Sequence, residues 1–312
     1  MRILSLFDGM STGQVALERA GIPVTEYYAS EIDKWAIQIS DKNYPDTIQL
    51  GDIENIDPLK LPHIDIVLCG SPCQGFSQAG LQKGFDDPRS RLWWKAQKII
   101  RTLYIRNPNL KYLVENVVMK QEWIDVISES LEGGPPVKIN SSLVSAQSRK
   151  RLYWSNIPIE QPSDRKIYLH DILDDGVTDR EKAYCLDSCY YKSGRGSLKN
   201  YFEKSRRQIV FGCEDEPIRI GTALDIKGHD MLRRVYHPLG KSPTLTTLTG
   251  GNQHKKVAVT PTHYRKLSPL ECERLQTMPE RYTEGVSDTQ RYKMLGNGWT
   301  ADVIAHILGG VS

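Results

Sequence analysis

Short apolar runs alternate with helix-like segments through the first half of the chain. Runs of strand length lie at residues 3–7, 24–30, 47–50, 64–68 and 111–114. Such alternation predicts an α/β fold with a doubly wound, Rossmann-like parallel sheet. In folds of this class, ligands bind beyond the carboxyl ends of the strands. The residues that follow each run are therefore the candidates for chemistry.

The second half of the chain begins with the same kind of pattern and then loosens. Residues 92–104 and 121–131 have helical periodicity, while residues 137–144 and 151–155 are strand-like. Beyond Ile157, many glycines and prolines separate short segments. This shift in composition predicts a second, smaller lobe.

Three of the predicted helices carry more specific expectations. The first has a core-facing apolar stripe made of Trp93, Trp94, Ile99, Ile100 and Leu103. Near the C-terminus, one helix is predicted to begin in the segment Arg265–Pro269. Another is predicted to span Val303–Leu308.

The composition is that of a globular protein with an ordinary core. The chain has 312 residues, of which 39% are hydrophobic, and its first apolar run meets Asp8 and Gly9 too soon for a secretory signal. No apolar stretch is long enough to cross a membrane. The six cysteines are scattered, which favours a reducing cytoplasm over a disulfide framework. Cys185, Cys189 and Cys213 with a histidine form an alternative zinc set, but their spacing favours ordinary packing.

A basic stretch between Tyr190 and Val210 contrasts with the net charge of only +3. Its cations are Lys192, Arg195, Lys199, Lys204, Arg206 and Arg207. The aromatic residues interleaved with them are Tyr190, Tyr191, Tyr201 and Phe202. A surface of this kind suits the phosphates and bases of a nucleic acid. A solvated helix face with its aromatic side chains turned to the core is an alternative.

A cysteine and a glutamate follow two of the apolar runs. Cys73 lies in the segment Gly70–Gly80, whose glycines permit close backbone approach, and Pro72 fixes the backbone before it. Glu115 follows the run at 111–114, so both groups are expected at the same edge of the sheet. A thiol and a carboxyl group in this arrangement can attack a ring and protonate it. Taken alone, a single cysteine is more often a buried packing residue.

A second set of polar residues follows the first three runs. The turn Asp8–Gly13 leads into a helix that Gly21 ends, and Glu31 comes where Rossmann-like folds hold the ribose hydroxyls of a nucleoside. Asp52 can accept a bond from an adenine amino group beside the apolar Ile53, or it can merely cap a turn. The glycine pattern lacks the pyrophosphate fingerprint, so a nucleoside without phosphates fits better.

The segment Gln147–Arg151 has the pattern Gln-x-Arg-x-Arg. Alternate residues of an extended segment point the same way, so Arg149 and Arg151 are expected on one face. Two guanidinium groups held together can bind a phosphate or a base carbonyl, and they can also hold a carboxylate. Surface solubility is the alternative for such a basic cluster.

Three motifs, in this order, resemble those of the C5-cytosine DNA methyltransferases. They are Pro-Cys-Gln at 72–74, Glu-Asn-Val at 115–117 and Gln-x-Arg-x-Arg at 147–151. The resemblance covers nearly the whole chain apart from residues 157–228. It implies a discontinuous catalytic domain, residues 1–156 and 262–312, and a target-recognition domain at 157–261. It also implies S-adenosylmethionine as the cofactor, S-adenosylhomocysteine as its product, no metal, and double-stranded DNA as the partner. The protein is expected to be a monomer in the cytoplasm, associated with the nucleoid of a bacterium or a phage-infected cell. The resemblance also suggests a role of the restriction–modification type.

The resemblance assigns roles to individual residues. The expected catalytic residues are Cys73, Glu115, Gln147, Arg149 and Arg151. The expected cofactor-binding residues are Phe7, Asp8, Gly9, Gly13, Glu31, Ile32, Asp52, Ile53, Gly70, Pro72, Asn297 and Trp299. The expected DNA-binding residues are Ser77, Arg91, Lys192, Arg195, Lys199, Lys204, Arg206, Arg207, Arg233 and Arg234. Residues 77–91 are expected to be a lid that closes over the DNA.

In the reaction that the resemblance implies, the target cytosine flips out of the duplex and the Cys73 thiolate adds to its C6 atom. Glu115 holds N3 and the amino group, while Arg149 and Arg151 position the base and Glu115. A transfer-RNA cytosine methyltransferase of the same fold and a catalytically silent DNA-binding relative are alternatives. A Rossmann-type dehydrogenase is disfavoured by the missing pyrophosphate glycines.

Overall fold

The computed structural model describes residues 1–71, 91–192, 201, 204–211, 219–222, 234–236, 256–257 and 264–311. Six of the predicted site residues lie outside the described residues: Pro72, Cys73, Ser77, Arg195, Lys199 and Arg233. The predicted lid lies outside them too, except for Arg91. For Arg234 the structure describes the backbone alone.

A seven-stranded sheet forms the centre of the larger lobe, with the strand order β3-β2-β1-β4-β5-β7-β6. Its strands are β1 (Arg2–Leu6), β2 (Glu26–Ser30), β3 (Ile48–Gln49), β4 (Ile66–Gly70), β5 (Lys111–Val117), β6 (Val137–Asn140) and β7 (Lys150–Ser155). β7 runs antiparallel to its two neighbours, whereas the other pairs are parallel. The strand order reverses between β1 and β4, which creates the switch point where α/β sheets bind ligands. The predicted α/β class is confirmed.

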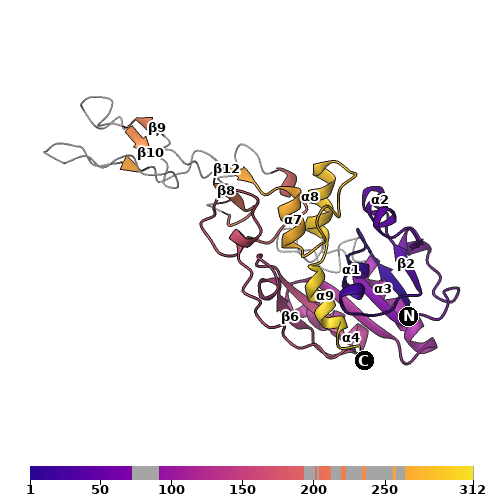
Figure 1. Cartoon of the computed structure of the whole chain (residues 1–312). Helices are drawn as coiled ribbons and strands as arrows, with labels where there is room; N and C mark the ends of the chain where they lie inside the picture. Colours follow the sequence, from indigo (N-terminus) through magenta and orange to yellow (C-terminus); the bar gives the residue numbers. More distant parts are fainter. Residues whose placement is uncertain are drawn as a thin grey trace.

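Helices cover both faces of this sheet (Figure 1). The helices α1 (Thr12–Arg19) and α9 (Ala301–Leu308) lie side by side on one face. On the other face lie α3 (Arg91–Arg106) and α4 (Gln121–Leu131). Along β4, Ile66 and Leu68 join the core under α1 and α9, while Val67 and Cys69 join the core under α3 and α4. The sheet is therefore buried on both sides, which explains why its strands are nearly continuous apolar runs.

The C-terminal segment joins the two lobes. A third core cluster packs α7 (Pro269–Leu275) and α8 (Asp288–Asn297) against side chains from α2 (Lys34–Asn43) and from the segment 167–191. The strand β12 (Tyr264–Lys266) pairs antiparallel with β8 (Ile209–Phe211) beside these helices. A separate small sheet is made of β9 (Arg219–Thr222), β10 (Arg234–Tyr236) and β11 (Lys256–Val257), and Figure 1 shows β9 and β10 far from the seven-stranded sheet.

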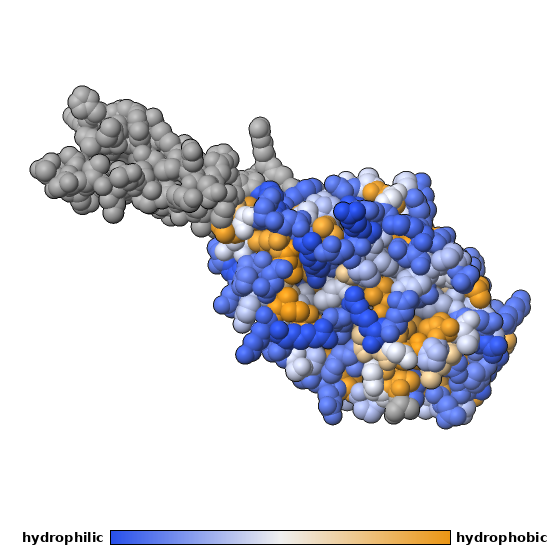
Figure 2. Space-filling view, in the orientation of Figure 1, coloured by the Kyte–Doolittle hydropathy of each residue, from blue (hydrophilic) through white to orange (hydrophobic). Residues whose placement is uncertain are grey.

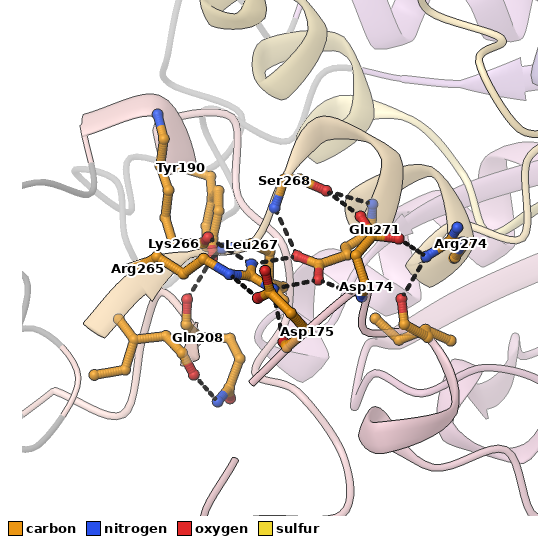
Figure 3. A network of polar contacts seen from close by, with 12 residues as sticks. Asp174, Asp175, Tyr190, Gln208, Arg265, Lys266, Leu267, Ser268, Glu271 and Arg274 are labelled. Carbon is orange, nitrogen blue, oxygen red and sulfur yellow. Dashed lines mark hydrogen bonds and ion pairs between the residues drawn. The ribbon is translucent and has the colours of Figure 1, made fainter. Parts of the chain in front are cut away.

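A network of buried polar contacts holds this junction together (Figure 3). Arg265 donates to both carboxylate oxygens of the fully buried Glu271 at 2.7 Å, and also to Asp175. The Tyr190 hydroxyl accepts from the Leu267 backbone N–H at 2.9 Å and donates to the Gln208 carbonyl. Because these residues come from both sides of the junction, the start of α7 is tied to the smaller lobe.

Most predicted elements are confirmed with shifted ends, and one expectation, that for Trp94, is wrong. Trp93 is buried, but Trp94 is 43% exposed, because adjacent helical residues point about 100° apart and cannot share a stripe. Residues 265–266 belong to β12, and the helix starts only at Pro269, with Ser268 as its N-cap in a capping box with Glu271.

Among the described residues, no helix is long and apolar enough to cross a membrane. The face of the molecule seen in Figure 2 is mainly hydrophilic, with its apolar side chains in several separate groups.

Candidate active site

Glu115 is held from two sides at the carboxyl end of β5. In the sheet register it lies between Gly70 of β4 and Tyr153 of β7. Its Oε1 atom forms an ion pair with Nε of Arg151 at 2.9 Å, and its Oε2 atom accepts a hydrogen bond from Nε1 of Trp299 at 3.1 Å. Only 10% of the Glu115 side chain is exposed. The carboxylate therefore has a fixed orientation at the edge where β4 leads toward residues 72–74.

The position of Arg151 follows from the sheet register. Arg151 pairs with Val117, and Tyr153 pairs with Glu115, so Arg151 and Glu115 are diagonal neighbours on one face of the sheet. Diagonal neighbours are within reach of long side chains. Arg151 also donates to the carbonyl of Lys150 at 2.8 Å.

Arg149 has a different partner set from Arg151. Arg149 is 3% exposed, and its guanidinium donates to the backbone carbonyls of Leu186 at 3.0 Å and Gly298 at 2.9 Å, with a longer bond to Gly296. These carbonyls belong to the segment that follows β7, to the end of α8 and to the turn between α8 and α9. Arg149 thus joins three distant segments of the chain. The expectation that Arg149 positions the base and Glu115 stays a prediction.

Gln147 is fully buried and also joins segments. Its Nε2 atom donates to the Leu275 carbonyl at 2.7 Å and to the side chain of Gln276 at 2.9 Å. Its Oε1 atom accepts from the Leu186 backbone N–H at 3.3 Å. These contacts join the segment that carries Gln147 to residues 186 and 275–276, and its expected catalytic role stays a prediction.

The thiol of Cys185 lies against both arginines of the Gln-x-Arg-x-Arg segment. Its Sγ atom is 3.4 Å from Nη1 of Arg149 and 3.9 Å from Nη2 of Arg151. The prediction that the two arginines share one face is therefore confirmed. Burial opposes the thiolate, yet the two guanidinium groups outweigh it and lower the pKa of Cys185.

Cys69 has the opposite character, although it precedes the predicted nucleophile by only a few residues. Burial raises the pKa of the Cys69 thiol to about 12, and the nearby Glu115 carboxylate adds to this shift. Its side chain belongs to the core under α3 and α4. Cys69 is therefore a packing residue, not a nucleophile.

The ends of β1, β2 and β3 converge at the other side of the switch point. The backbone N–H of Gly9 donates to Oε2 of Glu31 at 2.8 Å, and the Ser30 hydroxyl donates to the carbonyl of Gly51 at 2.8 Å. Glu31 directly follows Ser30, and Asp52 directly follows Gly51, so their carboxylates lie at neighbouring points of the sheet edge. The tight path of this turn requires a positive φ at Phe7, Gly9 and Ser11.

Several of the predicted cofactor residues are already engaged within the protein. Oδ1 of Asp52 accepts from the Glu54 N–H at 3.0 Å, so Asp52 caps a turn, and Ile53 is buried in the core. A contact of Asp52 with the cofactor stays a prediction. The Asp8 carboxylate accepts from Ser11 and Tyr27, both at 2.6 Å. Burial raises the pKa of Asp8 in spite of these hydrogen bonds.

Three further cofactor candidates differ in exposure. Ile32 is 74% exposed beside Glu31, and Asn297 is exposed at the end of α8. Gly13 lies in α1, where a Cβ atom would come within 2.7 Å of the Tyr27 hydroxyl. A contact of these three residues with the cofactor stays a prediction.

The basic stretch is less open than the sequence suggests. Arg206 and Arg207 both approach Asp187, at 3.0 and 3.9 Å. Tyr190 and Tyr201 are fully buried, so for these two rings the alternative of aromatics turned to the core is confirmed. Lys204 is exposed, Lys192 lies over the Tyr191 ring, and Arg91 pairs with Glu54 at 3.2 Å.

The described residues contain no group of three or more side chains that could hold a metal ion. Of the alternative zinc set, Cys213 lies outside the described residues, while Cys185 and Cys189 are free thiols.

Sequence reasoning missed two contacts at this site. The fully buried Asn116 donates from Nδ2 to the Ser71 hydroxyl at 2.8 Å, which links the Glu-Asn-Val segment to the end of β4. The position of Asn116 directly after Glu115 was a signal for this link. The bond from Trp299 to Glu115 spans 184 residues of sequence, and no local pattern indicates it.

Comparison with known proteins identifies the family. The 18%-identical structure of the methyltransferase EhMeth from Entamoeba histolytica matches the fold with a TM-score of 0.67 over 100% of this chain and 97% of that one. Among sequences, the type II methyltransferase M.NlaX of Neisseria lactamica is 29% identical over 98% of this chain and 94% of its own length. The orphan methyltransferase M.SPBetaI of Bacillus phage SPbeta is 26% identical over 98% of this chain and 96% of its own length. The family model described as C-5 cytosine-specific DNA methylase matches residues 1–133 and 134–311, so the chain belongs to this family of methyltransferases.

Proposed function

We propose that this enzyme transfers a methyl group from S-adenosylmethionine to C5 of a flipped-out cytosine in a short duplex DNA sequence, through a covalent bond between Cys73 and C6. The observation that carries the proposal is the fixed orientation of Glu115, with Arg151 on one oxygen and Trp299 on the other. Such an arrangement suits a group that must meet the edge of one base in one geometry.

Cys73 fits this role because of its place in the chain. It follows Ser71 by two residues, and chain geometry limits two such Cα atoms to a separation of about 7 Å. Gly70, which precedes Ser71, is the direct neighbour of Glu115 in the sheet. A thiol tethered this closely can work with Glu115 on one base.

Atoms and electrons balance in each step of the proposed reaction. The Cys73 thiolate adds to C6, and the electron pair of the C5–C6 bond is delocalised through the ring toward N3, where Glu115 shares a proton. The electron-rich C5 then takes the methyl group, which S-adenosylmethionine supplies as an electrophile while its sulfonium becomes the thioether of S-adenosylhomocysteine. Loss of the C5 proton to a base and departure of the Cys73 thiolate restore the aromatic ring.

The described residues fit the nucleoside part of this cofactor. Glu31 and Asp52 provide carboxylates at neighbouring strand ends, and the 74%-exposed Ile32 provides an apolar surface beside Glu31. Carboxylates suit ribose hydroxyls and an adenine amino group, and an exposed isoleucine suits a purine face. Glu31 is itself oriented by the N–H groups of Gly9, Ile32 and Asp33.

The target-recognition role is proposed for residues 157–261, with the catalytic domain made of residues 1–156 and 262–312. The polar junction around Arg265 and Glu271 supports this division, because it fixes the smaller lobe on α7. Double-stranded DNA is expected to lie between the two parts, bound by an enzyme that acts as a monomer.

The test is methyl transfer from labelled S-adenosylmethionine to duplex DNA and, separately, to transfer RNA. Wild type should label DNA at C5 of cytosine in one short context, as read by bisulfite sequencing, and Cys73→Ala should be inactive. Cys189→Ala is the matched control and should remain active. Label in transfer RNA alone would refute the DNA assignment, and DNA binding without any transfer would support a silent binding protein.

The covalent step has its own test. In DNA that carries 5-fluorocytosine, the last step fails because fluorine cannot leave as a cation, so the adduct should accumulate. Mass spectrometry should then find the modified cytosine on the peptide that contains Cys73. Attachment to Cys185, whose pKa the guanidinium groups of Arg149 and Arg151 lower, would overturn the assignment of the nucleophile.

A further inference from the structure

We propose that Trp299 is a positioning residue for Glu115, and that its indole N–H sets the geometry of the carboxylate during catalysis. This inference rests on the proposed function, because it assigns a role within the same site. It differs from the expectation that Trp299 serves only to bind the cofactor.

The hydrogen bond itself is the first observation. Nε1 of Trp299 lies 3.1 Å from Oε2 of Glu115, and the indole is 9% exposed. An indole nitrogen can only donate a hydrogen bond, and a buried one needs an acceptor. Since Arg151 holds the other oxygen at 2.9 Å, the two donors together fix both the position and the plane of the carboxylate.

The absence of a side chain at Gly70 makes room for the indole at this point. A Cβ atom at Gly70 would lie 2.9 Å from Nε1 of Trp299, and 3.0 and 3.1 Å from two ring carbons. Because Gly70 is the sheet neighbour of Glu115, its missing side chain creates the space through which the indole reaches the carboxylate.

The backbone around Trp299 is held by buried polar side chains. The carbonyl of Gly298 accepts from Arg149 at 2.9 Å and from Gln276 at 3.3 Å. The Thr300 hydroxyl donates to Oε1 of Gln276 at 3.0 Å. Gln147 contacts the same Gln276 oxygen, at 2.9 Å. The turn that carries Trp299 is thus fixed on both sides, as positioning requires.

These contacts also explain Arg149 and Gln147. Neither side chain is placed by its hydrogen bonds to touch Glu115, yet both support the turn that presents Trp299. The Gln-x-Arg-x-Arg segment therefore acts on Glu115 by two routes: Arg151 contacts it directly, and the other two residues act through the C-terminal turn.

The test is Trp299→Phe, which keeps an aromatic ring and removes the N–H. The expected result is a kcat for DNA methylation that is lower by about 10- to 100-fold, because a misplaced catalytic group costs up to about 100-fold. The KM for S-adenosylmethionine should change by less than about threefold, since removing a transition-state interaction lowers kcat without weakening binding.

Trp154→Phe is the matched control. Trp154 is also buried, and its Nε1 donates to the Ser128 hydroxyl at 2.9 Å, on the α4 side of the sheet. The Trp154→Phe variant should lower thermal stability about as much as Trp299→Phe does, while leaving kcat and KM unchanged. A similar loss of kcat in both variants would show that the effect of Trp299→Phe is merely structural.

Gly70→Ala is a second variant that keeps the N–H but displaces the indole. It should lower kcat in the same direction as Trp299→Phe, and combining the two should add little. If Trp299→Phe raises the KM with kcat unchanged, the indole is a cofactor contact and the inference is wrong. Inactivity of the wild type toward DNA would instead refute the proposed function, so the two failures are distinguishable.

Discussion

The ion pair between Arg151 and Glu115 should contribute strongly to stability as well as to chemistry. Replacing Arg151 by Met removes the cation while keeping most of the side-chain volume. The Glu115 side chain is 10% exposed and the Arg151 side chain 15%, so the remaining carboxylate cannot hydrate fully. Removing one partner of a buried pair costs about 3–5 kcal/mol. Because some water reaches this pair, we expect the lower limit, about 3 kcal/mol of the free energy of unfolding.

A double-mutant cycle separates the pair from other contacts of Arg151. Glu115→Gln keeps the shape and an acceptor for Trp299, and should cost about 1–2 kcal/mol, as expected for a lost charge-assisted bond. The double variant should be more stable than the sum of the single effects predicts, by about 2 kcal/mol. Urea unfolding followed by tryptophan fluorescence measures each free energy. At about 2 °C per kcal/mol, Arg151→Met should also lower the melting temperature by about 6 °C.

The exposed pair between Arg2 and Glu26 is the matched control. It is as short, at 2.6 Å, but its side chains are 43% and 39% exposed. Solvent screens an exposed pair, so the same cycle with Arg2→Met and Glu26→Gln should give a clearly smaller coupling energy than the cycle at Arg151 and Glu115. Additive effects at Arg151 and Glu115, within about 0.5 kcal/mol, would refute the reasoning.

Three further predictions concern the surroundings of this pair. The two guanidinium groups lower the pKa of Cys185 in spite of its burial, so its alkylation rate, followed by peptide mass spectrometry, should reach half its maximum at a higher pH in Arg151→Gln than in the wild type; an unshifted midpoint would contradict this. Gln276→Leu should lower the free energy of unfolding by about 2–3 kcal/mol, since it leaves buried partners without hydrogen bonds; a neutral effect in urea unfolding would exclude that role. Arg265→Met should lower the free energy of unfolding by about 3 kcal/mol, because it leaves the fully buried Glu271 without its cation. An unchanged melting temperature in calorimetry would contradict this prediction.

The strands of the sheet and the candidate residues at their ends were predictable because they depend on local patterns. Continuous apolar runs identified β1, β2, β4 and β5, and the residues at their ends identified Glu31 and Glu115. Parallel strands bring their carboxyl ends to one edge, so the approach of these groups followed from topology alone. The expectation for Trp94 was wrong because the apolar stripe that includes Trp93 and Ile100 excludes the next residue, which points about 100° away.

The roles of individual polar residues were less predictable, because they depend on contacts between distant segments. Gln147 and Arg149 stand in the same pattern as Arg151, but their partners are carbonyls and amides of residues 186, 275–276 and 296–298. A sequence pattern shows which groups are present, and not which direction each one takes once buried. The burial of Tyr190 and Tyr201 within an otherwise basic stretch has the same explanation.

The active site is completed by the last part of the chain. β4, β5 and β7 bring Gly70, Glu115 and Arg151 together through the sheet register, and Arg151 pairs with Oε1 of Glu115. The turn before α9 supplies a donor for Oε2 from Trp299, and the same turn is fixed by Arg149. Since α9 also covers α1, which follows the predicted cofactor turn, a shift of α9 would disturb both the Glu115 carboxylate, which is proposed to hold the base, and the predicted cofactor side of the sheet. The C-terminal segment therefore couples the two halves of the site.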